Sequence, residues 1–241
     1  MECPALYIVE LIMARRNEHS REQIREFALI AADKIIQNGG LASLTTRRVA
    51  QEIGYTVGTL YLVFENLDDL VSLVNVRTLE RISARLTESA AAVQYDTEKL
   101  ETLVTTFVEF LRDAPYHWAC VVEHHYFGGS AYASRMAEQM EMIIQLFVVA
   151  LGQVMAQRSL PEREDAAQAL WSGIQGVYLF DPQARVGGEP SKQRIWDFVY
   201  TYLQGLNVNR RGQSSGSFKM DRGICTEKRL SYSGARASEL S

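Results

Sequence analysis

The spacing of apolar residues is the feature of this chain that most restricts its fold. Between Arg21 and Asn38 the apolar residues recur every three or four positions, which places them on one face of an α-helix. They are Ile24, Phe27, Ala28, Ala31, Ala32, Ile35 and Ile36. The sequence contains neither the polar–apolar alternation of a half-exposed strand nor a two-residue hairpin turn. It therefore predicts an all-α protein.

Helix start and stop signals divide the chain into further helices. A Gly-Gly pair at 39–40 ends the first helix, and Asp69, three residues after Asn66, gives a variant capping box. The N-cap residues that we expect are Ser20, Thr56 and Asn66. The later helices are predicted over 46–53, 57–64, a stretch that begins near 67, 98–112, 116–126, 130–157, 162–180 and 191–206.

These helices form a small and a large group. We expect an extension with a basic arm over residues 1–20, a three-helix domain over 21–66, and a larger helical domain over 67–206, in which 67–89 connects the two. Residues 207–241 contain seven Ser and four Gly and show little periodicity, so we expect a disordered basic tail. A hydrophobic content of 47% excludes disorder of the whole chain.

The net charge of −4 is unevenly distributed. Residues 207–241 carry seven Lys/Arg against three Asp/Glu, whereas the rest of the chain carries 18 against 26. The tail is therefore +4 and the body −8. A body this acidic does not bind polyanions through its overall charge. Any contact with a nucleic acid must come from a few well-placed cations.

The cysteines and the lengths of the apolar runs indicate a cytoplasmic protein. Cys3, Cys120 and Cys225 are widely spaced and odd in number, which fits a reducing compartment and provides no disulfide framework or zinc knuckle. The longest apolar stretch, 142–155, is interrupted by polar residues and is too short to span a membrane. We expect a soluble protein without a membrane partner.

The three short helices at the amino-terminal side have the layout of a helix-turn-helix, with a tight turn at Gly54. In this motif the later helix enters the major groove of DNA. Threonine and tyrosine hydroxyls lie near the predicted helix starts, where they can contact phosphates. Arg47 and Arg48 fall in the first turn of the second helix and can hold a phosphate or pair with guanine. The alternative is a compact three-helix unit whose hydroxyls only cap helices.

The segment Leu44–Leu70, LTTRRVAQEIGYTVGTLYLVFENLDDL, resembles the helix-turn-helix signature of the TetR/AcrR family of bacterial repressors. The resemblance is specific over residues 21–75 and architectural beyond them. The small-domain core that it implies consists of Ile24, Phe27, Ala31, Val49, Ile53, Leu60 and Phe64.

The same resemblance implies a DNA-binding surface. Thr45 would cap the second helix. Thr56 and Tyr61 would hold phosphates, and Gly58 and Thr59 would approach the bases. The arm before the first helix would add contacts to nearby phosphates or to the minor groove. The complete set of implied DNA-binding residues is Arg15, Arg16, Arg21, Thr45, Thr46, Arg47, Arg48, Thr56, Val57, Gly58, Thr59 and Tyr61.

Three positions depart from the family pattern. Leu62, Val63 and Leu67 stand where family members usually have His, Tyr or a phosphate-binding Lys. Two or three phosphate contacts are therefore missing, and residues 13–70 carry a net charge of −1. We expect a shallower salt dependence of DNA binding than in a member with the full set of cations. The main alternative function is a helical interaction module of the same fold that has lost DNA binding.

The resemblance implies that residues 90–206 sense an effector and form a homodimer. The last two predicted helices are unusually apolar and aromatic, and such a pair can build a four-helix contact with its two-fold mate. The expected interface residues are Trp171, Gly173, Ile174, Gly176, Val177, Trp196, Val199, Tyr202 and Leu203. The alternative is that these aromatic residues form the core of the monomer.

A group of His, Cys and aromatic residues between 116 and 127 is the candidate effector site. Positions 117, 120 and 124 share one helix face and could contact a small apolar or aromatic molecule. Imidazole and thiolate can also bind zinc or copper, but the spacing alone does not indicate a metal, and we expect none. Ordinary core residues are the third interpretation. The expected pocket residues are Phe107, His117, Cys120, His124, Phe147 and Tyr178.

The sequence lacks the motifs of the common enzyme classes. It contains no serine nucleophile elbow, phosphate-binding glycine loop or HExxH motif. We expect no cofactor and no catalysis. The predicted function is that of a DNA-binding transcriptional regulator, a homodimeric repressor that a small effector releases from a pseudo-palindromic operator.

The beginning of the chain differs in character from the residues after it. Residues 1–12 form an apolar segment that has no place in a helix-turn-helix domain, whereas Met13 opens a sequence that looks like the start of a family member. We expect residues 1–12 to be absent from the functional protein, because an exposed apolar segment favours aggregation. The alternative is an extra helix that packs on the small domain.

Overall fold

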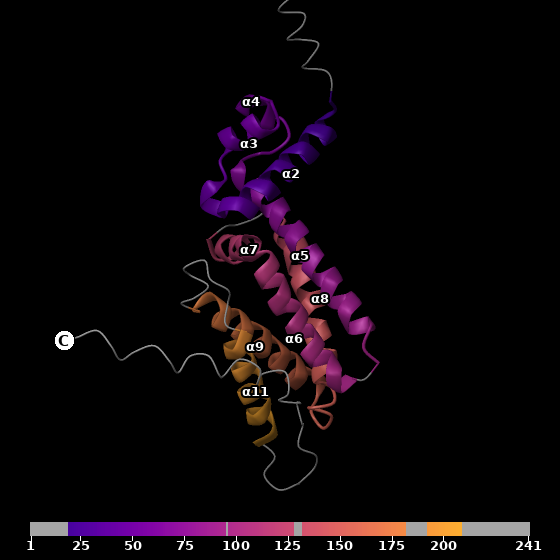
Figure 1. Ribbon diagram of the computed structural model, residues 1–241. Coiled ribbons are helices and arrows are strands. Elements are labelled where there is room, and N and C mark those ends of the chain that lie inside the picture. The colour runs from indigo at the N-terminus through magenta and orange to yellow at the C-terminus, as the bar shows by residue number, and fades with distance from the viewer. Residues whose placement is uncertain (1–18, 95, 128–131, 182–191, 209–241) are drawn as a thin grey trace, which may run out of the picture. The chain divides into compact units, whose positions relative to one another are not determined.

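The structure is a computed structural model that describes residues 19–94, 96–127, 132–181 and 192–208 (Figure 1). Within these residues every regular element is a helix, so the prediction of an all-α protein is confirmed. The elements are α2 (Arg21–Gly39), the 3₁₀ turn η1 (Leu41–Ser43), α3 (Thr46–Glu52), α4 (Val57–Leu60), α5 (Leu67–Ala91), α6 (Asp96–Asp113), α7 (Pro115–Phe127), α8 (Ala133–Leu151), α9 (Leu160–Leu179) and α11 (Lys192–Val208).

Some expectations fall outside this part of the chain. Arg15, Arg16, residues 1–12 and the tail from 209 onward lie outside the described residues. Among the helices that are described, none combines the length and the apolar character that a membrane span requires.

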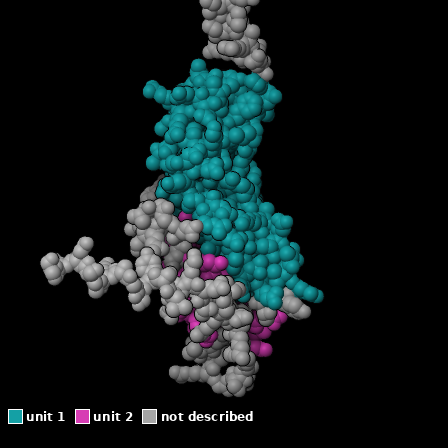
Figure 2. All heavy atoms as spheres, viewed as in Figure 1, with its two compact units in different colours: residues 1–150 teal, residues 151–241 magenta. Residues whose placement is uncertain are grey.

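The chain forms two compact units, residues 1–150 and 151–241 (Figure 2). The first unit contains α2 to α7 and almost all of α8, and the second contains α9 and α11. In the first unit α5 packs on α2, α6 and α7, and α7 also packs on α2. The second unit is built on the packing of α11 against α9.

The first helix begins and ends where its capping residues predict. Ser20 Oγ accepts a hydrogen bond from the Gln23 N–H at 3.2 Å, and Gln23 Oε1 accepts one from the Ser20 N–H at 2.7 Å. This reciprocal pair is a capping box. At the other end Gly40 has a φ of 69°, a left-handed conformation that favours glycine, and its N–H donates to the Ile36 carbonyl.

The next three predicted N-caps are also confirmed. Thr45 caps α3, Thr56 caps α4 and Asn66 caps α5, each by accepting the N–H of the residue three positions later. Such a cap stabilises a helix by about 1 kcal/mol. The capping box at α5 takes a different form from the one predicted, because the Asp69 carboxylate accepts the N–H of Glu65.

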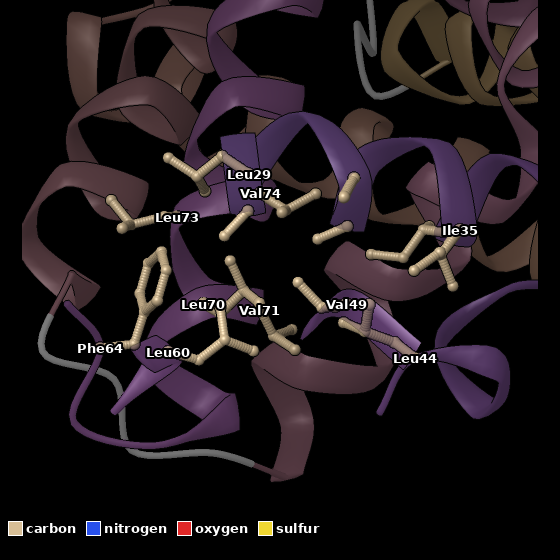
Figure 3. Packing of buried hydrophobic residues seen from close by; sticks show 14 of the residues in the cluster. Leu29, Ile35, Leu44, Val49, Leu60, Phe64, Leu70, Val71, Leu73 and Val74 are labelled. Carbon is tan, nitrogen blue, oxygen red and sulfur yellow. The ribbon is translucent and has the colours of Figure 1, made fainter. Parts of the chain in front are cut away.

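An apolar cluster holds α2, α3, α4 and the start of α5 together, with Leu60 and Phe64 pointing into it (Figure 3). The burial predicted for Ile24, Ala31, Val49, Leu60 and Phe64 is confirmed, and Ile53 is partly buried against the cluster. A buried residue of the size of Leu60 stabilises the fold by about 1.5 to 3 kcal/mol. The burial of this cluster therefore stabilises the positions of the short helices α3 and α4.

The prediction that Phe27 belongs to this core is wrong. Its side chain is 36% exposed. The inward stripe of α2 runs through Ile24, Ala28 and Ala31, and Phe27 lies at its edge, where its ring packs edge-on against His19 with 5.0 Å between the ring centroids. The residue covers a neighbouring aromatic ring and does not enter the cluster.

Two helices are shorter than predicted. α4 ends at Leu60, because the N–H groups of Leu62 and Val63 bond to carbonyls three residues back, which is the tighter 3₁₀ pattern. α8 ends at Leu151, just before Gly152. Glycine disfavours a helix by about 1 kcal/mol relative to alanine.

In the second unit α9 and α11 approach closely at Gly173. A Cβ atom on this glycine would lie 2.0 Å from Phe198 Cζ, and two further atoms of the same ring lie within 3 Å of it. The Phe198 ring in turn stacks on Tyr202, whose hydroxyl donates to the Ala166 carbonyl at 2.8 Å. Gly173 thus allows the ring of Phe198 to lie directly on α9.

We expect Gly173→Ala to lower the midpoint of thermal unfolding, because the new methyl group would displace the Phe198 ring at a cost of about 1 to 3 kcal/mol. Gly176→Ala is the matched control, since no described atom other than its chain neighbours and its own helix backbone lies within 4 Å of that Cβ position. It should leave the midpoint unchanged or raise it. Equal midpoints for the two variants, measured by circular dichroism, would contradict the close approach.

Candidate nucleic-acid interface

α3 and α4 are joined by a tight turn centred on Gly54. This glycine has a φ of 73°, and its N–H donates to the Gln51 carbonyl at 3.2 Å. The next N–H, of Tyr55, donates to the Ala50 carbonyl at 2.9 Å. Together with the burial of Leu60, these bonds hold α3 and α4 as a helix-turn-helix.

The predicted DNA-binding residues that the structure describes remain accessible on this motif. The exposed ones are Arg21, Thr45, Arg47, Arg48, Thr56, Gly58 and Tyr61. The half-buried ones are Thr46, Val57 and Thr59. The Tyr61 side chain, directly after α4, is 55% exposed. The motif therefore presents hydroxyls and guanidinium groups to solvent.

Part of the hydroxyl capacity is used inside the motif. Thr56 Oγ1 accepts the Thr59 N–H and lies 3.0 Å from Thr59 Oγ1. Thr45 caps α3 in the same way, and Arg48 donates to the Ser43 carbonyl at 3.3 Å. Thr45 and Thr56 thus set the helix starts through hydrogen bonds within the protein.

His19 makes a contact that sequence reasoning missed. Its Nδ1 lies 2.7 Å from Tyr55 Oη, and its ring packs edge-on against those of Phe27 and Tyr55. Tyr55 belongs to the turn between α3 and α4, so the residue before the N-cap of α2 is attached to that turn. The contact joins positions 36 residues apart, and no local sequence signal could have indicated it.

Arg25 supports the segment that follows α4. Its guanidinium donates to the Val63 carbonyl at 2.7 Å and to the Tyr132 hydroxyl at 2.6 Å, and it lies 4.9 Å from the centroid of the Phe64 ring. Arginine stacked on an aromatic ring is favourable in itself. The guanidinium of Arg25 therefore positions the backbone just after Tyr61. Sequence reasoning also missed this role of Arg25.

α7 contacts the helix-turn-helix domain through His117. His117 Nε2 lies 3.1 Å from Asp33 Oδ1 of α2, and Arg81 of α5 donates to the same oxygen at 3.2 Å. The hydrogen bond from buried His117, assisted by the charge of Arg81, lowers the pKa of Asp33. Because an ionised carboxylate only accepts, Nε2 is the protonated nitrogen in this contact.

Cys120 and His124 lie on the same face of α7 and are buried. The Cys120 side chain belongs to the apolar cluster, its backbone carbonyl accepts a hydrogen bond from Asn75 of α5, and burial raises the pKa of its thiol to about 12. His124 is 7% exposed, and neither of its ring nitrogens has a hydrogen-bond partner among the described residues. Burial lowers the pKa of His124, and Asp68 of α5 partly opposes this shift.

The residues predicted for an effector pocket are all buried. Phe107 packs edge-on against Trp118 with 5.0 Å between centroids. Tyr178 belongs to the second unit, and burial raises its pKa to about 12. His117 contacts Asp33 of α2. The effector pocket itself stays a prediction. Within the described ranges, no three His, Cys, Asp or Glu side chains are placed to hold a metal ion.

The residues predicted for a dimer interface separate into two groups. Trp171, Ile174, Val199 and Leu203 are buried within the chain. Gly173, Gly176, Val177, Trp196 and Tyr202 are half-buried. The accessible parts of the second group are therefore available for contact with a second chain, and the interface itself stays a prediction.

Residues 28–74 match the sequence profile of the bacterial regulatory proteins of the TetR family. This span runs from α2 through α3, the Gly54 turn and α4 into α5. The chain therefore contains a DNA-binding domain of the TetR-family type over these residues. The resemblance of Leu44–Leu70 to the family signature is thereby confirmed, and the protein is a DNA-binding transcriptional regulator.

Solved structures share the fold of this chain. A TetR-family regulator from Agrobacterium tumefaciens has a TM-score of 0.58 at 15% identity, covering 77% of this chain and 98% of its own. One from Streptomyces coelicolor has a TM-score of 0.56 at 18% identity, covering 76% and 99%. BioQ with its natural double-stranded DNA operator has a TM-score of 0.55 at 19% identity, covering 79% and 99%. A sequence search of curated proteins finds no match.

Protonation of His124 should make the stability of this regulator depend on pH. Its pKa is lowered from the usual histidine value of about 6.5, so the unfolded state takes up a proton first as the pH falls. As the pH falls from about 6.5 to the lowered pKa, the free energy of unfolding therefore decreases. We expect His124→Gln to flatten this decrease between about pH 7 and pH 5, measured by urea unfolding at a series of pH values.

Cys120→Ala is the matched control for this pH series. It removes a buried side chain from the same face of α7, and its thiol, with a pKa of about 12, does not titrate in this range. It should lower the free energy of unfolding by the same amount at each pH. Parallel pH curves for the wild type and His124→Gln would show that His124 does not carry the effect.

Proposed function

We propose that this TetR-family protein is a homodimeric repressor. Each chain would place α4 in the major groove at one half of a pseudo-palindromic operator, with half-sites about one turn of DNA, ~34 Å, apart or slightly more. A small apolar or aromatic effector would release the operator by binding more tightly to a second conformation. The protein would act in the cytoplasm, where bacterial DNA is accessible.

The observation that carries this proposal is a family helix-turn-helix whose inner side is packed and whose outer side is free. Leu60 and Phe64 bury the inner side, and the caps of Thr45 and Thr56 fix both helix starts. Tyr61 remains exposed on the outer side. The fold shared with BioQ, a protein solved with its operator, supports the same use of the motif here.

Charge contributes little to this surface. Residues 45–66 contain two Arg and two Glu, and Glu52 pairs with Lys34 at 2.6 Å. The long-range attraction to DNA is therefore small, and direct contacts have to supply the specificity. This supports the expectation of a shallow salt dependence.

We expect Arg47→Ala to weaken binding to the DNA upstream of the protein's own coding sequence by about 1 to 3 kcal/mol if Arg47 reads a base. Tyr61→Phe should weaken binding to all sequences alike, because it removes only the hydroxyl that would hold a phosphate. The measurement is a gel shift at low and at physiological salt.

Arg135→Ala on α8 is the control, since it removes one cation that pairs with Glu80 outside the helix-turn-helix. It should leave the affinity nearly unchanged. If wild-type protein binds no specific DNA at either salt concentration, the alternative of an interaction module that has lost DNA binding is correct. If Arg47→Ala and Tyr61→Phe both bind as well as the wild type, the recognition surface lies elsewhere.

Dimerisation is proposed to use the half-buried face of α9 and α11. Gly176 offers a test because the space around its Cβ position is open in the chain, so a larger side chain fits without strain. We expect Gly176→Glu to leave the fold intact and to convert a dimer into a monomer, because the interface would bury an unpaired charge on each chain.

Sedimentation velocity at micromolar concentration measures this change. Ala137→Glu, at an exposed position of α8, is the matched control and should remain dimeric. A wild-type protein that sediments as a monomer would refute the homodimer and the repressor mechanism with it.

The contacts of α7 support regulation by an effector. Through His117 and Cys120, α7 is packed into the helix-turn-helix domain, so a movement of α7 would have to change the packing of α2. A ligand with different affinities for two positions of α7 would therefore change the affinity for DNA. Release of bound operator on titration with apolar and aromatic compounds tests this step.

A further inference from the structure

Leu62 is a large apolar side chain that the fold holds in solvent. It is 62% exposed and directly follows Tyr61 after α4. Two residues on either side, Leu60 and Phe64 are buried, and the Phe64 N–H donates to the Leu60 carbonyl at 2.9 Å. Because these two side chains anchor the turn to the apolar cluster, Leu62 has to point away from it.

The backbone that carries Leu62 is firmly held. The next carbonyl, that of Val63, accepts a hydrogen bond from Arg25 at 2.7 Å, and the Leu62 N–H donates to the Thr59 carbonyl at 3.2 Å. Ordering this side chain on a ligand therefore requires little further loss of backbone freedom. Leu62 is presented on a fixed turn.

The polar groups one turn earlier leave room for an apolar contact. The hydroxyls of Thr56 and Thr59 are engaged with each other at 3.0 Å, and Gly58 adds no side chain above the helix. A Cβ at Gly58 would find open space apart from Thr56 Oγ1 at 3.7 Å. The end of α4 can thus approach a base edge closely.

We propose that Leu62 contacts the 5-methyl group of a thymine in each operator half-site. A leucine can neither hydrogen-bond to a base nor hold a phosphate, and the thymine methyl group is the apolar feature that the major groove displays. The inference rests on the proposed DNA binding and adds the base that this position selects. It also gives a role to one of the residues that replace the family's usual phosphate contacts.

The test uses the full chain and duplexes that it selects from a random DNA library. In the selected operator each thymine is replaced in turn by deoxyuridine, which removes only the 5-methyl group. We expect the wild type to lose about fourfold in affinity at one thymine per half-site, the factor expected for one buried methyl group. Leu62→Ala should lose a similar factor on the thymine operator and nothing more when that thymine is replaced.

Val149→Ala is the matched control, because Val149 is an exposed apolar residue, 59% accessible, on α8. It should bind as the wild type does and show the same sensitivity to deoxyuridine. Additive losses for Leu62→Ala and deoxyuridine, or no thymine whose methyl group matters, would overturn the assignment of Leu62 while leaving DNA binding intact. If the chain enriches no DNA sequence at all, both this inference and the proposed function fail.

Discussion

The helix-turn-helix domain depends on the burial of apolar side chains from five helices in one cluster. α4 has only four residues, and a helix this short has no stability of its own. Leu60 and Phe64 hold it in place by entering the cluster. Cys120 of α7, far away in the sequence, packs into the same cluster. The outward direction of Tyr61 and Leu62 is a consequence of that inward packing.

Polar contacts refine this arrangement without providing most of its stability. The caps of α2 to α5 set the helix starts, Arg25 supports the backbone after α4, and His19 ties the entrance of α2 to Tyr55. Ion pairs between α2 and α5, such as Asp33 with Arg81, are partly exposed and are worth little individually. Their importance lies in orientation, because the Asp33 carboxylate also accepts the hydrogen bond from α7.

The same packing explains how a nearly neutral surface can belong to a DNA-binding regulator. A motif with few cations cannot rely on attraction to the phosphate backbone, so shape and short-range contacts have a larger share of the binding energy. A rigid turn with exposed Tyr61 and Leu62 is suited to such contacts. His117 and Cys120 connect α7 directly to the domain that carries this surface.

The sequence by itself determined the parts of this protein that depend on neighbours in the chain. The capping threonines, the glycine at the turn and the apolar stripe of α2 act within about four residues, so the helix starts, the helix-turn-helix and its family signature could be predicted. Other features depend on which helix faces meet: the exposed position of Phe27, the early end of α4 and the burial of Trp171. Only the tertiary structure decided these features, together with the contacts of His19, Arg25 and His117, because each joins residues that are far apart in sequence and meet only once the core has packed.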